Sequence, residues 1–169
     1  MLESISDSII KWEVFSNEDL CEHFPFEEWN LMVSDIETDA EWKIFLNSYK
    51  DFIKCYVLYT CTDNKAIAFL YIYNEDKSSK SVSVHGGGWG KSFHLSLLYY
   101  RGLILMIQYL WQQGFRVRTS CMLENKRAYR FLQSVGFVKY RSTDTYIYMW
   151  INEKRLKGNR MYKHLYREC

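Results

Sequence analysis

The chain has 169 residues, of which 48% are hydrophobic and 25% are charged, and its formal net charge at pH 7 is +2. These values exclude a disordered or low-complexity chain and are typical of a globular domain that buries its own core. A net charge so close to zero gives no strong overall field, so no nucleic-acid partner is expected.

The cysteines and the apolar runs predict the compartment. The five cysteines are odd in number and include no C-x-x-C pair, and no signal peptide precedes them, so we expect reduced thiols and a cytoplasmic protein. Cys55, Cys61 and Cys121 lie in apolar runs and are interpreted as buried structural thiols. The longest apolar run, Leu97–Trp111, is too short for a bilayer, so no membrane association is expected.

The first half of the chain predicts strands separated by two helices. Residues 9–15 alternate as a strand, Ser16 offers a cap for a helix from about Asn17, and Pro25 interrupts that segment. A second helix is expected over 39–49, where apolar residues recur at helical spacing. Three strands follow at 52–61, 65–73 and 80–85, and the short turns between them predict an antiparallel meander.

Residues 80–114 contain the main candidate for a ligand-binding site. A strand ending at His85 leads into a loop with four glycines, Gly86, Gly87, Gly88 and Gly90, and then into an apolar helix from about Ser96 to Gln113. Loop amides and the positive end of a helix favour a negative ligand, so this order predicts an anion site. A strand at 115–121 follows the helix and is expected to run parallel to the strand at 80–85.

The remainder predicts a capped helix, a hairpin and a basic tail. Asn125 caps a helix expected to bury Ala128, Phe131, Leu132 and Val135, and the hairpin pairs 137–141 with 145–151. Its Tyr146, Tyr148 and Trp150 share one face, which is interpreted as core; an acceptor pocket and a second subunit of a homodimer remain open. Residues 152–169 carry a net charge of +4 and are expected to form a short helix.

The elements therefore follow the order β-α-α-β-β-β-α-β-α-β-β in one α/β (α+β) domain spanning residues 1–169. We expect a mixed, mostly antiparallel sheet of about seven strands with helices on both faces.

Residues 123–137, Leu-Glu-Asn-Lys-Arg-Ala-Tyr-Arg-Phe-Leu-Gln-Ser-Val-Gly-Phe, are similar to the N-x-x-A/S-x-x-x-L/Y-x-x-x-G-F signature of the GNAT acyltransferase family. The element order also resembles that fold. The resemblance implies an N-acetyltransferase that binds acetyl-CoA (coenzyme A) and moves its acetyl group to the amine of a small molecule or peptide. No metal is expected, because no set of ligands has metal-binding spacing.

The resemblance implies a coenzyme site around the glycine-rich segment. Its candidate residues are Val84, Gly86, Gly87, Lys91, Phe93, His94, Leu95, Ser96 and Asn125. The family's [RQ]-x-x-G-x-[GA] loop falls at 93–98 in this chain, where no glycine occurs. The glycines lie upstream, so the site is expected to be re-routed, with Lys91 or His94 supplying charge.

His85, at the end of the expected central strand, is the candidate base that deprotonates the amine, with a hydrogen-bonded structural histidine as the alternative. His23, Glu22 and Glu124 are weaker candidates, and amides near His85–Gly87 are candidates to polarise the thioester. Many family members protonate the departing thiolate with a tyrosine where this chain has Leu132. Tyr129 and Tyr140 are the candidate replacements.

Two other functions remain open at this point. Residues 85–92, His-Gly-Gly-Gly-Trp-Gly-Lys-Ser, differ from the nucleotide-binding P-loop pattern only at the first position, although too little chain follows for the parallel sheet of such proteins. A non-catalytic binding module with the GNAT fold is the second alternative, favoured by the missing loop glycines and by Leu132.

Overall fold

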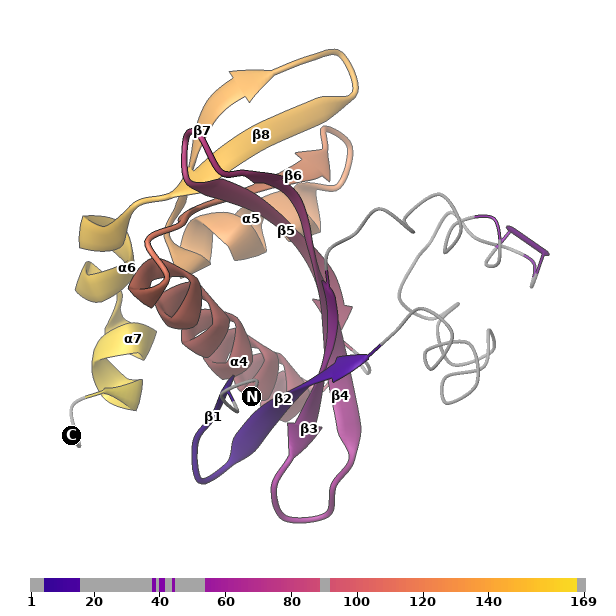
Figure 1. Cartoon of the computed structure of the whole chain (residues 1–169), viewed down its shortest axis with the longest axis vertical. Coiled ribbons are helices and arrows are strands. Elements are labelled where there is room, and N and C mark those ends of the chain that lie inside the picture. The colour runs from indigo at the N-terminus through magenta and orange to yellow at the C-terminus, as the bar shows by residue number, and fades with distance from the viewer. Residues whose placement is uncertain are drawn as a thin grey trace. The chain divides into compact units, whose positions relative to one another are not determined.

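The computed structural model describes residues 5–15, 38, 40, 41, 44, 54–88 and 92–166 of the chain. Its eight strands form one mixed sheet in the order β1-β2-β3-β4-β5-β6-β8-β7 (Figure 1). The strands are β1 (Ile5–Ser6), β2 (Ile10–Phe15), β3 (Lys54–Thr60), β4 (Ala66–Asp76), β5 (Ser81–Gly88), β6 (Arg116–Met122), β7 (Phe137–Ser142) and β8 (Tyr146–Ile151). The helices are α4 (Phe93–Gln112), α5 (Lys126–Val135), α6 (Glu153–Gly158) and α7 (Arg160–Leu165).

The chain divides into two compact units. Unit 1 comprises residues 1–74 and 85–105, and unit 2 comprises residues 75–84 and 106–169. The chain passes from one unit to the other near the end of β4, within β5 and within α4, so each of these three elements contributes to both.

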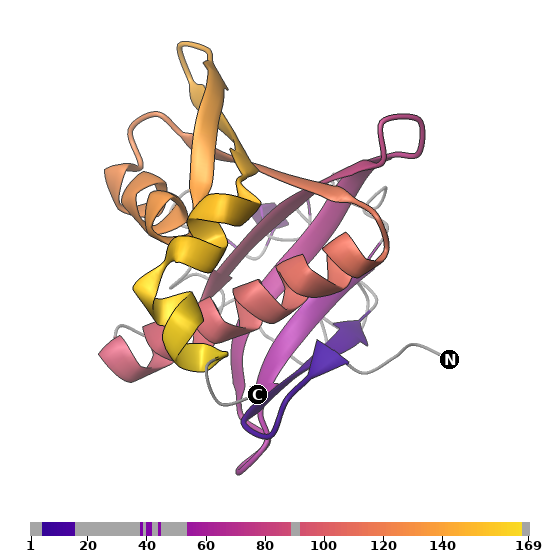
Figure 2. The same ribbon diagram turned by 90° about the vertical axis from the view of Figure 1, so that its left-hand side faces the viewer.

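In unit 1, antiparallel strands pack against the first part of α4. β2 pairs with β3 from Ile10↔Thr60 to Phe15↔Cys55, and β3 pairs antiparallel with β4. A Cβ on Gly102 of α4 would lie 2.5 Å from a methyl carbon of Leu58, so glycine is what allows the helix to approach the strands this closely. α4 crosses these strands in Figure 2. The Trp12 indole Nε1–H donates to the Gly102 carbonyl at 2.8 Å inside this buried layer.

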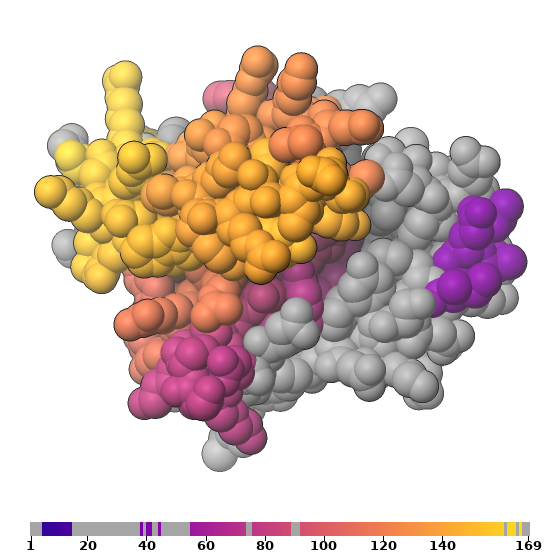
Figure 3. Space-filling view, turned by 90° about the horizontal axis from the view of Figure 1, so that it is seen from above, coloured from indigo at the N-terminus to yellow at the C-terminus, as the bar shows by residue number. Residues whose placement is uncertain are grey.

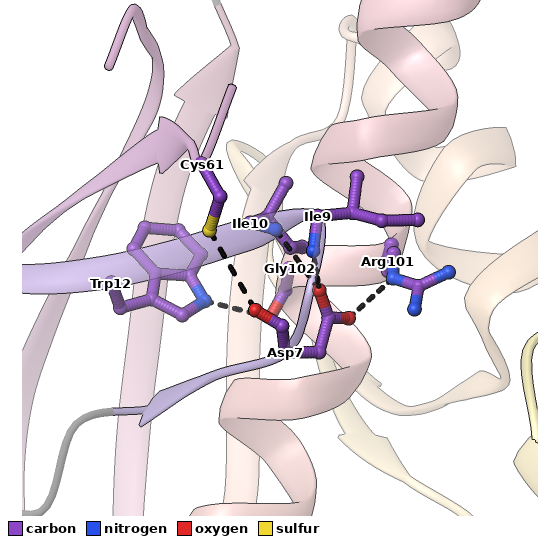
Figure 4. A network of polar contacts seen from close by, with 7 residues as sticks. All are labelled: Asp7, Ile9, Ile10, Trp12, Cys61, Arg101 and Gly102. Atoms are coloured by element: carbon purple, nitrogen blue, oxygen red, sulfur yellow. Dashed lines mark hydrogen bonds and ion pairs between the residues drawn. The ribbon is translucent and has the colours of Figure 1, made fainter. Parts of the chain in front are cut away.

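A polar network closes the β1–β2 turn of unit 1 (Figure 4). The Asp7 carboxylate accepts the backbone N–H groups of Ile9 at 2.7 Å and Ile10 at 2.9 Å, and its other oxygen pairs with Arg101 of α4. The Cys61 thiol donates to the Asp7 carbonyl at 3.6 Å. Arg101 lies in the mainly apolar α4, and this half-buried ion pair gives its charge a partner in the fold.

In unit 2, β5 and β6 pair in parallel from Ser81↔Arg116 to Ser83↔Arg118. β8 pairs antiparallel with both β6 and β7, with a bulge between Lys139 and Arg141. The Asn125 side chain caps α5 by accepting the Ala128 N–H at 2.9 Å. Gly136, at φ 121°, ends that helix in a backbone conformation that favours glycine, and a Cβ there would meet the Leu156 backbone nitrogen at 2.9 Å.

Most predicted elements are confirmed. The parallel pairing of β5 with β6, the Asn125 cap, the last hairpin and the mixed, mostly antiparallel sheet are all present, with eight strands instead of about seven. The additional strand is the two-residue β1, which is too short to give a period-2 pattern.

Some predictions were wrong in detail. The basic tail forms two short helices instead of one. Cys61 is exposed, because it lies in the turn after β3 and not within the strand. In α5 only Val135 is fully buried, while the other three predicted core positions are half-buried.

The helix expected from Asn17, with the break at Pro25, lies outside the described residues. Within the helix expected over 39–49, Ala40, Glu41 and Ile44 are described and helical. Thr38 and Glu41 exchange bonds between side chain and backbone at 3.0 and 3.2 Å, which is a capping box that fixes the start of this helix. Among the described helices, none has the combined length and hydropathy needed to cross a bilayer.

Candidate functional site

The first three glycines of the predicted loop belong to strand β5. A Cβ on Gly86 would lie 2.3 Å from the Phe69 carbonyl oxygen of β4 and 3.2 Å from the Tyr99 hydroxyl of α4. A Cβ on Gly87 would lie 3.1 Å from the Phe69 ring. The glycine-rich segment is therefore explained by close packing inside unit 1, and the prediction that a loop begins directly after His85 is wrong.

Helix α4 begins at Phe93, three residues before the predicted start at Ser96. Ser92 is its cap: the Ser92 hydroxyl accepts the Leu95 N–H at 3.2 Å, and the Ser92 carbonyl accepts the Ser96 N–H and hydroxyl, each at 3.2 Å. The segment 93–98 is thus the first part of a helix and not a loop, which is why it needs no glycine.

The start of α4 has donors that fit a phosphate group. Among the described residues, the N–H groups of Phe93 and His94 have no acceptor, as expected for the first turn of a helix. The His94 side chain is exposed, and Phe93 is 79% exposed. Two amides, the positive end of a 20-residue helix and an accessible imidazole form a donor set for an anion. Lys91 lies outside the described residues.

His85 lies in β5 immediately before the three glycines of the strand. Its imidazole is exposed to solvent, yet enough protein surrounds it for desolvation to lower its pKa. A pKa below the usual value keeps the ring neutral at pH 7, and a neutral imidazole can accept a proton.

The ladder between β5 and β6 covers only the beginning of each strand. Its last registered pair is Ser83↔Arg118, whereas β5 runs on to Gly88 and β6 to Met122. At the next position the buried Thr119 hydroxyl donates to the Val84 carbonyl at 2.8 Å. A side-chain hydroxyl thus takes the place of a backbone donor at this carbonyl, directly after the last ladder pair.

Comparisons with known proteins agree with this topology. No family model matches the chain, and no curated protein matches it in sequence. Among solved structures, apo FdhC, described as a nucleotide-linked sugar GNAT, is similar with a TM-score of 0.72 at 13% identity over 98% of this chain and 99% of that one. A GCN5-related N-acetyltransferase from Brucella melitensis has a TM-score of 0.71 at 12% identity over 98% of this chain and 84% of that one. The chain has the GNAT fold.

A third solved structure widens this comparison. A chimera of spermidine N-acetyltransferase SpeG from Vibrio cholerae and hSSAT is similar with a TM-score of 0.59 at 14% identity, over 89% of this chain and 99% of that one. Proteins with this fold are thus named for different acceptors, a nucleotide-linked sugar and spermidine. Sequence identities of 12–14% establish the fold alone.

The GNAT fold also decides the P-loop alternative. The first four residues of the 85–92 pattern are strand, with Gly86 held against the Phe69 carbonyl, so they do not form the loop that wraps a phosphate. β3 and β4 are antiparallel, unlike the parallel strands of a P-loop protein. The P-loop interpretation is therefore wrong.

The remaining predicted residues lie in unit 2. Asn125 caps α5 through its side-chain oxygen, as one of its two predicted roles requires. Tyr129, on the same helix, is half-buried, and its hydroxyl oxygen accepts from the Gln133 amide at 3.2 Å, which leaves its own proton available to donate. Tyr140 is exposed at the bulge of β7, the edge strand that β8 separates from β6.

Sequence reasoning missed two residues that contact β5. Tyr99 projects from α4 towards Gly86 and Gly88, with ring carbons 3.5 and 3.6 Å from the position of a Cβ on Gly88, and burial raises its pKa. Thr119 bonds Val84. The alternation of β6 marks Thr119 as an inward-facing polar residue, which is the signal that could have identified it.

Proposed function

We propose that this chain is an N-acetyltransferase that uses acetyl-CoA and acts on a primary amine. The observation that carries the proposal is the match of 98% of the chain to solved GNAT structures, together with a capped helix start whose first amides have no acceptor among the described residues. The chemistry that acetyl-CoA supplies is an acetyl group activated as a thioester.

The proposed coenzyme site combines the end of β5 with the start of α4. The amides of Phe93 and His94 and the His94 imidazole hold the pyrophosphate, and Ser92 keeps the first helical turn in place through its bond to Leu95. Lys91 precedes this turn in the sequence and adds a positive charge in the proposal. The thioester end is proposed to lie beside β5 past Val84, where the ladder with β6 has ended.

His85 is the proposed base. The attacking amine of the acceptor must lose a proton, and the imidazole of His85 is exposed and has a pKa lowered by desolvation. Amides near His85, Gly86 and Gly87 are proposed to polarise the thioester carbonyl. Of the two tyrosines, we propose Tyr129 as the acid that protonates the leaving thiolate. Tyr129 lies one helical turn before Leu132, the position at which many family members have a tyrosine. Tyr140 lies on the edge strand β7.

The first test measures binding and turnover separately. Calorimetry with acetyl-CoA and with CoA is expected to give saturable heat, and an amine panel is expected to include an acceptor that releases free thiol. If both His94→Ala and Lys91→Ala bind acetyl-CoA as tightly as the wild type, the proposed pyrophosphate site is contradicted. The absence of heat at millimolar ligand would leave the alternative of a non-catalytic binding module.

The second test concerns His85. His85→Ala is expected to lower kcat by about 10²-fold or more, the usual contribution of a positioned base, and to leave the Kd for CoA unchanged. In the wild type, kcat should rise with pH through a pKa below 6.5, and the variant should lose this limb. An unchanged pH–rate profile in His85→Ala would remove His85 from the mechanism, while His94→Ala serves as a control that changes Kd and keeps the profile.

A further inference from the structure

Charge is divided very unevenly between the two units. Unit 1 contains seven Lys and Arg against fourteen Asp and Glu, whereas unit 2 contains fifteen against six. The formal net charges are therefore −7 and +9, and they nearly cancel in the whole chain. The expectation that no nucleic acid binds was based on that total, which hides a strongly basic unit of 74 residues.

One face of the unit 2 sheet carries a row of aromatic side chains. In β8, Ile147, Met149 and Ile151 are buried, whereas Tyr146 and Trp150 are 41% and 44% exposed and Tyr148 is half-buried. The interpretation of these three aromatic residues as core is therefore wrong. The ring centroids of Tyr146 and Tyr148 lie 6.4 Å apart. Figure 3 shows the β7–β8 hairpin, in amber, at the molecular surface.

Two arginines flank this row. Arg118 of β6 is directly opposite Trp150, and Arg141 of β7 is opposite Tyr148, with its guanidinium carbon 5.8 Å from the Tyr148 ring centroid. Directly opposite residues share a face of the sheet, so both cations lie beside the aromatic row. Neither arginine forms an ion pair within the part of the chain that the structure describes. Asp144 is the one carboxylate in β6, β7, β8 and the β7–β8 turn.

We propose that this face, made of Arg118, Arg141, Tyr146, Tyr148 and Trp150, binds single-stranded nucleic acid. The three rings lie at alternate positions of β8 and together span about 13 Å along the strand. The row therefore offers several successive stacking positions. Bases stack on such rings whatever their identity, and the arginines supply the cations that phosphates require. A duplex keeps its bases stacked inside and cannot use the row.

The chemistry on this face favours a nucleic-acid strand over an apolar protein surface. An apolar partner surface would leave two arginines without a counter-charge, whereas a strand supplies an aromatic group and a negative charge at every repeat. The inference does not depend on acetyl transfer, and either can fail without the other.

The test uses the full chain and a fluorescein-labelled 12-nucleotide oligo(U) RNA. Anisotropy is expected to show saturable binding that weakens as salt rises, with quenching of tryptophan emission. Trp150→Ala and Tyr148→Ala are each expected to weaken binding at least fivefold, while Trp150→Phe retains a ring and most of the affinity. Arg141→Gln should lower the slope of log K against log salt by about one.

The control is Lys154→Gln in α6, which removes one charge from unit 2 without touching the proposed face, and it is expected to change affinity less than twofold. A 12-base-pair RNA duplex should bind more weakly than the strand. Equal affinity for duplex and strand, or wild-type affinity in both ring-to-Ala variants, would overturn the proposal. So would sedimentation data in which the free protein is a dimer that Trp150→Ala dissociates, because a second copy would then cover the face.

Discussion

The two units contrast in how they use the same elements. Unit 1 packs its elements so closely that a Cβ on Gly86 would meet the Phe69 carbonyl oxygen and one on Gly102 would meet a Leu58 methyl group. It binds its part of α4 through a buried indole and an ion pair. Unit 2 connects its part of α4 to α7 through a half-buried bond from Gln108 to the Tyr162 hydroxyl at 3.0 Å, and it leaves an aromatic, basic sheet face exposed. Unit 2 also has a close approach, at Gly136 beside the Leu156 backbone, but its sheet is distinguished by the alternation in β8, which buries one face and leaves the other exposed.

The largest expected effect comes from filling the closest approach in unit 1. Gly86→Ala places a methyl group 2.3 Å from a backbone oxygen that cannot rotate away, so the strands must separate, and we expect a loss of about 3 kcal/mol in the free energy of unfolding. Denaturant unfolding measures it. The matched control, Gly158→Ala in unit 2, meets nothing within 4 Å and lies in a helix, so it should be neutral or slightly stabilising. Equal losses in both variants would remove the contrast between the units.

A smaller effect compares the two polar contacts of α4. Trp12→Phe removes a buried hydrogen bond and part of a buried ring, and should cost about 2 kcal/mol. Tyr162→Phe removes only the hydroxyl that Gln108 contacts at a half-buried position, and should cost about 0.5 kcal/mol. If Tyr162→Phe proves as costly as Trp12→Phe in thermal or denaturant unfolding, unit 2 is more tightly specified than its exposed face indicates.

The last expected effect depends on pH and appears under alkaline conditions. Burial, and secondarily the Glu13 carboxylate, raises the pKa of Tyr59 in unit 1 to about 12. Unfolded tyrosine ionises near pH 10, so the contribution of the buried phenol to stability is complete below that pH and is lost as pH rises towards 12. The stability difference between wild type and Tyr59→Phe should change by at most about 1 kcal/mol between pH 9 and pH 11. A difference independent of pH would mean that the phenol ionises normally.

The contrast between local and distant causes explains what could be predicted from the sequence. The Asn125 cap, the stop at Gly136 and the alternation of β8 are local patterns, and they were predicted correctly. The role of Gly86 depends on the Phe69 carbonyl in another strand, and no local pattern reveals that contact. From the sequence alone, Gly86, Gly87 and Gly88 therefore predict a ligand-binding loop. The start of α4 is predicted three residues too late for a related reason, because assigning 93–98 to a loop excludes the cap that Ser92 provides.

The candidate site was predicted less completely than the fold. The exposed His85 and the accessible helix start at Phe93 and His94 are consistent with the roles expected from the resemblance to the family. The aromatic face was recognised as a pattern, but its exposure was not, because alternation alone does not say which face of a strand is covered. Burial of Ile147 and Met149 decides this, and it follows from tertiary packing.

The turn between β4 and β5 has a consequence for behaviour in acid. The Asp76 carboxylate accepts bonds from the hydroxyls of Ser78 and Ser79 and from both of their backbone N–H groups, and the Ser78 hydroxyl is the leading cause that holds its pKa far below the usual range. Bonds of this kind are kept until the pH falls through that depressed pKa. When most carboxylates have already taken up protons, these three residues should still keep their native hydrogen bonds.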